Sequence, residues 1–311
     1  PRLARGLNAT KVDVDPNHLA TVTEQKAVKG AGPKAGRRWL FGTGRLGFAS
    51  LPLMNGRIGL NVTELVLPDG IVLPNFLLKA SLQDSAGGSM KVDQFKSGFG
   101  DGVLVADGVI SQYTSASPTL RLRGHARNFR LDRLLAQVDE AKAFGQVKGG
   151  EGEFAFHLEG QGTSLRSLVS GLNGELQLSL NSATIPHALV DSAGDFVITM
   201  MNAVNPLRSK STVTELQCVS AYLPVRGGQV SINNSVGIAT DQLNIILDGQ
   251  VDLKQERMQI DIQTAQKSGL TTGVNPAGLV VVQGTLLNPS LGINKTGVVK
   301  QAATVGLAVV T

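Results

Sequence analysis

Cysteine, histidine and aromatic side chains are scarce in this sequence of 311 residues. Its single cysteine, Cys218, excludes a disulfide within the chain and stands in no C-x-x-C pair. The histidines are His18, His125, His157 and His187, and none of them has the H-x-x-x-H or H-E-x-x-H spacing of a metal site. We therefore expect no metal centre.

The sequence also lacks catalytic signatures. Neither Ser164 nor Ser170 lies in a G-x-S-x-G motif. The turn that begins at Gly160 has two glycines of a dinucleotide-binding fingerprint, but Leu165 stands at the position of the third glycine and no P-loop lysine follows. We expect no enzyme activity and no cofactor.

Long apolar runs and a signal peptide are absent as well. No stretch of about 18 apolar residues occurs, and the chain begins with Pro1 in place of an initiator methionine. We interpret the chain as a fragment whose membrane anchor or export signal lies outside it.

Basic residues outnumber acidic residues only at the N-terminal end. Residues 1–40 hold eight of the 29 Lys and Arg and three of the 24 Asp and Glu, so that 21 bases balance 21 acids in the rest. Without interleaved aromatic residues this pattern does not predict nucleic-acid binding. We expect 1–38 to be the end of a preceding element plus a basic flexible linker, and 39–311 to be the folded body, with sub-parts 39–145 and 146–311.

Alternation of apolar and polar residues is abundant, and 149–180 shows it best. The first half of this segment predicts a strand, the glycines Gly160 and Gly162 predict a turn, and Ser164 can cap a short helix after it. Gly174 suits the exit of that helix, and a second strand follows. The apolar residues on one face of the two strands are Phe154, Phe156, Leu158, Leu176, Leu178 and Leu180.

The rest of the chain repeats this pattern of strand and turn. Helical spacing occurs in only three places, at 131–145, 165–172 and 186–205, where the last helix could pack in the core or contact acyl chains through its two methionines. Turns are predicted at Gly227-Gly228, Asn233-Asn234 and Asp248-Gly249, and the strand at 103–111 is expected to be interrupted at Asp107-Gly108. About three short amphipathic helices cannot cover so many half-buried strands, so the sheet must curl into a barrel, a sandwich or an open groove.

Several segments resemble the C-terminal region of the AsmA family, Gram-negative envelope proteins related to TamB and YhdP-like proteins. These segments are GEGEFAFHLEGQGTSLRSLVSGLNGELQLSL from Gly150, LQCVSAYLPVRGG from Leu216, LDGQVDLKQERMQIDI from Leu247, VQGTLLNPSLGI from Val282, and the run from Trp39 to Leu73. The resemblance covers about residues 39–305 and consists of glycine and leucine spacings. It implies a mainly β fold, an elongated and curled antiparallel sheet that forms an apolar groove.

The resemblance also implies a periplasmic protein, anchored to the inner membrane by an N-terminal helix that this chain lacks. Its expected function is bridge-like lipid transfer and outer-membrane biogenesis, with the acyl chains of phospholipid or another envelope lipid shielded in the groove and no covalent chemistry. The expected partners are the inner membrane, the outer membrane and other envelope proteins, and no nucleic acid. Candidate groove residues are Leu243, Ile245, Leu247, Val251, Leu253, Met258, Ile260, Ile262, Phe154, Phe156 and Leu158, with Gly160, Gly162, Ser164 and Gly174 as the structural motif.

A second function class fits the same pattern of strands. An exposed sheet edge can pair with a strand of another protein, so the chain could be a structural or assembly module that binds envelope proteins. Lipid co-purified with the chain favours the first function, and a captured protein without lipid favours the second.

Overall fold

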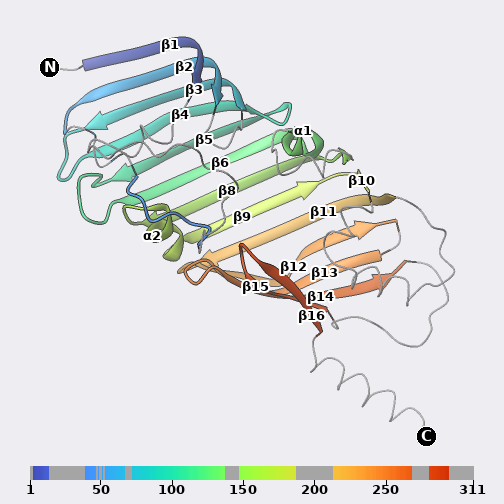
Figure 1. Cartoon of the computed structure of the whole chain (residues 1–311). Coiled ribbons are helices and arrows are strands. Elements are labelled where there is room, and N and C mark those ends of the chain that lie inside the picture. The colour runs from blue at the N-terminus through green and yellow to red at the C-terminus, as the bar shows by residue number, and fades with distance from the viewer. Residues whose placement is uncertain are drawn as a thin grey trace, which may run out of the picture.

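A single 16-stranded sheet dominates the computed structural model (Figure 1), which describes residues 3–13, 39–46, 48, 51, 53–66, 72–136, 147–186, 213–241, 243–267 and 280–293. The sheet is open, because the strand order runs from β1 to β16 without closing. The predicted mainly β, curled antiparallel fold is therefore confirmed. The strands are β1 (Leu3–Asp13), β2 (Gly56–Val66), β3 (Val72–Gln83), β4 (Ser89–Phe99), β5 (Gly102–Ser111), β6 (Thr119–Arg130), β7 (Lys148–Gly149), β8 (Glu151–Gln161), β9 (Asn173–Leu180), β10 (Ala183–Pro186), β11 (Val213–Arg226), β12 (Gln229–Thr240), β13 (Leu243–Asp252), β14 (Arg257–Gln266), β15 (Val280–Thr285) and β16 (Pro289–Ile293).

Neighbours in the sheet are mostly neighbours in the sequence. From β2 to β16 the main path is antiparallel, and only the short strands β7 and β10 lie off it, paired with each other and, through β10, with β11. β1 is the exception in direction, because it pairs with β2 in parallel. The sheet thus includes residues before position 39. The division of the chain into a peripheral part, 1–38, and a folded body, 39–311, stays a prediction.

Two short helices lie at opposite ends of the strands (Figure 1). α1 (Leu131–Leu135) follows β6, and α2 (Leu165–Ser170) follows β8. The predicted helix at 186–205 falls outside the described residues, apart from Pro186 at the end of β10. Of the α2 side chains expected to face the sheet, Leu168 is buried but Leu165 is 45% exposed, because α2 lies at the sheet end and covers it with one turn only.

Ser164 caps α2 as predicted. Its hydroxyl accepts from the Ser167 backbone N–H, and the Ser167 hydroxyl in turn accepts from the Ser164 N–H, which completes a capping box. The cap satisfies two backbone donors at the helix start that the helix itself leaves without partners.

Ser164→Ala is expected to lower the free energy of unfolding by about 1 kcal/mol, the usual cost of losing an N-cap. Ser170→Ala is the matched control, because the Ser170 hydroxyl donates only to the Ser167 carbonyl one turn back. Urea unfolding followed by circular dichroism measures both. An equal loss for the two variants would contradict the role assigned to the cap.

The turn predicted at Gly227-Gly228 lies between β11 and β12. Two other predicted turns and one predicted strand interruption are wrong, because each lies inside a continuous strand. Asp107-Gly108 lies within β5, and Asp248-Gly249 lies within β13. Asn233-Asn234 lies within β12 at a register shift against β13, with Asn234 at φ +53°. A β-bulge inserts an extra residue without ending the strand, and asparagine and glycine tolerate the positive φ that such irregularities need.

Candidate functional site

One face of the sheet is apolar without interruption from β2 to β15. Residues directly opposite in a ladder point to the same face. The first ladder row across the strands is Leu60, Leu78, Phe95, Ala106, Gly124, Phe156, Leu176 and Leu223. We call the surface to which this row belongs the apolar face.

A second row continues the apolar face toward the C-terminal strands. It begins at Ala126, two residues from Gly124 on β6, and runs through Phe154, Leu178, Ala221, Val236, Leu247, Ile262 and Val280. The two rows overlap on β6, β8, β9 and β11, so the apolar face is a single surface across twelve strands.

Aromatic rings on the apolar face meet across several strands. Phe99 on β4 and Phe154 on β8 are separated by β5 and β6, yet their ring centroids are 5.5 Å apart. Phe129 joins both rings at centroid distances of 5.5 and 6.0 Å. Neighbouring strands lie about 4.8 Å apart, so rings three strands apart can meet in this way only if the sheet curls toward the apolar face.

Glycines on the apolar face make this curl possible. An added Cβ at Gly124 would lie 2.6 Å from the Val105 carbonyl oxygen and 2.8 Å from the Phe156 ring. At Gly152 it would lie 2.7 Å from the Ser179 carbonyl oxygen and 2.9 Å from the Phe129 ring. Aromatic rings therefore lie over glycines, and the strands approach more closely than any larger residue would allow.

The structure gathers most of the predicted groove residues on the apolar face. Leu247, Val251 and Ile260 pack on a buried cluster of Ala221, Ile232 and Val236. Met258 lies opposite Val251, and Ile262 lies opposite Leu247. Phe154, Phe156 and Leu158 lie on β8, where the first two rings stack at 6.0 Å, and Leu243 and Ile245 lie near the start of β13. Whether these residues contact lipid stays a prediction.

Leu253 and Gly174 are placed differently from the sequence prediction. β13 ends at Asp252, so Leu253 lies in the following turn, where its N–H donates to the Gly228 carbonyl. Gly174 is not the helix exit but the second residue of β9, at φ +132° and directly opposite Leu158. Gly162 has φ +143°, and an added Cβ at Gly160 would lie 2.9 Å from the Leu168 carbonyl oxygen, so both need the absence of a side chain.

A rim strap, formed by the described residues 39–46, 48, 51, 53 and 54, runs along one end of the strands. The Arg166 N–H donates to the Gly42 carbonyl, and the Leu46 N–H donates to the Thr163 carbonyl, both at the start of α2. Farther along, Phe48, Leu51 and Met54 pack on the buried side chains of Leu82, Ile110 and Tyr113. The rim strap therefore lies over the strand ends from β14 to β2.

Glu256 fastens the beginning of the rim strap. This carboxylate is 2% exposed and accepts hydrogen bonds from the backbone N–H groups of Leu40 and Phe41. Arg166 donates to it at 3.1 Å and also lies 3.8 Å from the centre of the Trp39 ring. Sequence analysis did not select Glu256, because its partners are 90 to 216 positions away and no local pattern marks it.

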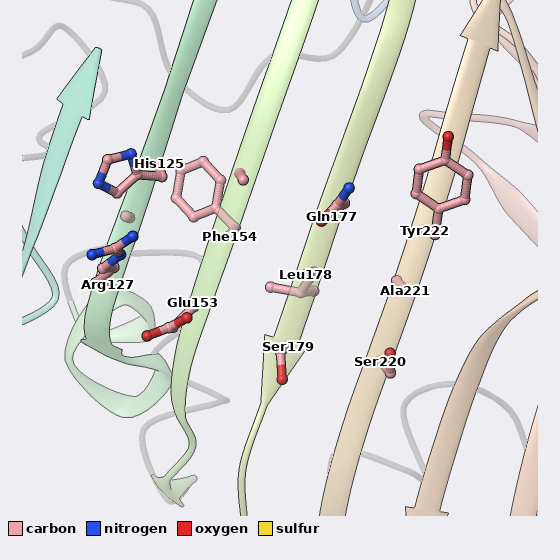
Figure 2. Close-up of a pocket in the computed structure, with 12 residues that line it drawn as sticks. His125, Arg127, Glu153, Phe154, Gln177, Leu178, Ser179, Ser220, Ala221 and Tyr222 are labelled. Carbon is pink, nitrogen blue, oxygen red and sulfur yellow. The ribbon is translucent and has the colours of Figure 1, made fainter.

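The opposite face of the sheet is polar and contains a shallow hollow of about 340 Å³ (Figure 2). The polar-face side chains that line it are His125, Arg127, Glu153, Ala155, Gln177, Ser179, Ser220 and Tyr222, from the adjacent strands β6, β8, β9 and β11. Most of these side chains are exposed, so a ligand here would compete with water for every hydrogen bond. Among the described residues, no group of three His, Cys, Asp or Glu is arranged to hold a metal ion.

Ion pairs and hydrogen bonds link neighbouring strands on the polar face. Arg121 donates to Glu159, which holds the pKa of that carboxyl below its usual value and raises the pKa of the guanidinium. The Tyr222 hydroxyl donates to Glu175 at 2.8 Å, and this bond raises the pKa of Tyr222. Both pairs are exposed cross-strand contacts, which fix register and leave the apolar face free of charge.

Comparison with known proteins agrees with the sequence pattern. The family model described as the AsmA family matches residues 54–235, more than half of the chain. No curated protein and no solved structure matches the chain. None of the helices in the described part of the chain is long and apolar enough to cross a membrane. The matched residues run from the end of the rim strap to β12 and include the central strands of the apolar face. Because the match covers more than half of the chain, the chain belongs to the AsmA family.

Proposed function

We propose that this chain is part of a bridge-like lipid-transfer protein of the Gram-negative envelope, which supports outer-membrane biogenesis by shielding phospholipid acyl chains on its apolar face. Membership of the AsmA family suggests a role in the envelope. On this proposal the protein is periplasmic, is anchored to the inner membrane outside this chain, and performs no covalent chemistry.

The uninterrupted apolar face is the observation that carries the proposal. Its twelve strands span about 50 Å along the sheet at about 4.8 Å per strand, which exceeds the length of one acyl chain. Many of its side chains are only partly buried, including those of Leu176, Leu223 and Ile245. A continuous apolar surface of this length is larger than a monomer normally exposes, and such a surface usually has a ligand.

The energetics favour lipid binding without a specific headgroup contact. Burying one methylene is worth about 0.8 kcal/mol, so ten buried methylenes could contribute about 8 kcal/mol before the ordering cost of the chain. An apolar path that is repeated across strands allows a lipid to move along the sheet, because each position offers similar contacts.

Mass spectrometry of the purified protein tests the proposal, with photocrosslinkers at four positions. We expect bound phospholipid, with lipid adducts at Ile245 and Ile260 and none at Asn244 and Gln259, whose side chains are exposed on the other face. Equal labelling of all four positions would contradict a lipid path on the apolar face. Absence of lipid together with a specific envelope protein would favour an assembly module that pairs through sheet edges.

A further inference from the structure

The fold separates the charges of the sheet by sign. Acids and bases balance over residues 41–311 as a whole, but not within the two halves of the sheet. The strands β2 to β6 contain eight Arg and Lys against three Asp and Glu, a net charge of +5. The strands β8 to β14 contain two Arg against eight Asp and Glu, a net charge of −6. Each half of the sheet therefore has a field of one sign.

The positive side chains of the first half gather on the polar face. One ladder row joins Lys91 through Val109 to Arg121, and the next joins Lys96 through Val105 to His125, which lines the hollow beside Arg127 (Figure 2). We call the exposed Arg and Lys of β3 to β6 the basic patch. Its members are Lys79, Lys91, Lys96, Arg121, Arg123 and Arg127.

The sheet neutralises only half of the basic patch. Lys91 pairs with Asp93, Arg121 with Glu159 and Arg123 with Asp107. Within the part of the chain that the structure describes, the other three members, Lys79, Lys96 and Arg127, form no hydrogen bond or ion pair. Three positive charges on neighbouring strands are thus available to an anionic partner.

The curl of the sheet decides what kind of partner fits the basic patch. The contact between the rings of Phe99 and Phe154 shows that the sheet curls toward the apolar face between β4 and β8, so the polar face is convex there. The convex faces of two copies of the chain would touch over few strands. Lipid headgroups can adapt to a convex surface, and a bilayer that touches β3 to β6 leaves the acidic strands tilted away from it.

We propose that the basic patch docks the chain on an anionic phospholipid bilayer and that the acidic strands β8 to β14 are held away from that bilayer. This inference rests on the proposed function, in which a membrane supplies the lipid. Each Lys or Arg close to an anionic surface strengthens binding about fivefold, and salt screens the attraction. In this orientation the apolar face leads away from the bilayer, from β2 toward β15.

A pair of double variants tests the position of the docking surface. Lys79→Gln/Lys96→Gln removes two unpaired charges from the basic patch, and Arg226→Gln/Arg257→Gln removes two exposed charges from the acidic half, so that both change the net charge equally. Flotation with vesicles of equal parts phosphatidylglycerol and phosphatidylcholine at low salt measures binding. We expect the first variant to bind about thirtyfold more weakly than the wild-type protein, and the second to lose less than about twofold. The excess charge of residues 1–40 is the same in all three proteins.

The single cysteine of the chain gives a readout of which half touches the vesicle. Cys218 is exposed on β11, opposite Ala239 of β12, so a fluorescent label there reports from the acidic half. The variant Gln94→Cys/Cys218→Ser moves the label to an exposed position of β4 opposite Lys79. A phosphatidylcholine with a nitroxide on its headgroup quenches fluorescence at short range. We expect its quenching to be several-fold stronger at position 94 than at position 218.

The outcomes separate this inference from the proposed function. Equal loss of vesicle binding in the two double variants, or equal quenching of the two labels, would overturn the basic patch as the docking surface. A salt-sensitive dimer that forms without vesicles and is lost only in Lys79→Gln/Lys96→Gln would assign the patch to a second copy, and would also overturn the inference. Wild-type protein that retains co-purified phospholipid but does not bind the vesicles overturns this inference alone. Vesicle binding without any co-purified phospholipid would overturn the proposed function alone.

Discussion

Ile245→Asp is expected to abolish phospholipid capture, whereas Asn244→Asp, one position earlier on β13, is expected to leave it unchanged. The two variants introduce the same carboxylate on opposite faces of one strand. Ile245 is partly buried on the apolar face, opposite Ile238 and Thr264, and Asn244 is exposed. Only the first variant therefore places a charge among acyl chains.

The size of the expected effect follows from the cost of removing a charge from water. An ionised carboxylate without a partner in an apolar environment costs several kcal/mol, and each 1.4 kcal/mol corresponds to a tenfold change in affinity. We expect lipid affinity to fall by at least about a hundredfold on this scale. The measurement is the amount of phospholipid that co-purifies with each variant, together with the melting temperature of each.

Ile245 is a better position for this test than Ile260. Ile260 packs on the buried cluster of Ala221, Ile232 and Val236, so a charge there would also destabilise the fold. Ile245 belongs to none of the buried clusters found in the described residues. Normal lipid capture by a folded Ile245→Asp protein would contradict the apolar face as the lipid path, and equal loss in Asn244→Asp would show that the added charge acts nonspecifically.

The alternation of side chains explains why the strands and their faces could be predicted. In the central motif the apolar residues of β8 and β9 recur every second position, and the structure pairs Phe154 with Leu178 and Phe156 with Leu176. A shift by one residue would turn every apolar side chain to the polar face, so the pattern determines the register as well as the strand. The apolar face is the sum of many such local patterns.

β-Bulges interrupt the alternation of apolar and polar residues, so the parts of the strands that contain them could not be predicted from it. In β6 the apolar face continues from Ala126 to Phe129, three positions later, because the register against β8 shifts between them and Asn128 has φ +54°. The alternation therefore breaks in the sequence while the strand continues. The same irregularity at Asn234 led to the wrong turn within β12. Asparagine fits both a turn and a bulge, and only the partner strand decides between them.

The hydrogen bonds that hold the rim strap on Glu256 could not be predicted for a different reason. Glu256 follows β13 in the sequence Leu-Lys-Gln-Glu-Arg, which is typical of an exposed polar turn. Its burial arises because Leu40 and Phe41 are brought to it from the other end of the chain. Long-range contacts of this kind depend on the complete sheet, so periodicity within a short window contains no information about them.

Gly174→Ala is expected to destabilise the protein by about 3 kcal/mol or more, because two independent penalties coincide there. Gly174 has φ +132°, which only glycine adopts readily. An added Cβ would also overlap the His157 carbonyl oxygen and lie 3.0 Å from the Leu158 Cα. Both of these atoms belong to the backbone of β8 and cannot move aside without breaking the ladder between β8 and β9.

Gly171→Ala provides the matched control three residues away. Gly171 ends α2 at φ −118°, and an added Cβ would have no atom within 4 Å, so alanine there should change stability by less than about 1 kcal/mol. Urea unfolding of the two variants measures the difference. Similar stability of the two proteins would mean that β9 shifts its register to admit the methyl group. Such a shift would turn Leu176 and Leu178 away from the apolar face, and lipid capture should then fail with it.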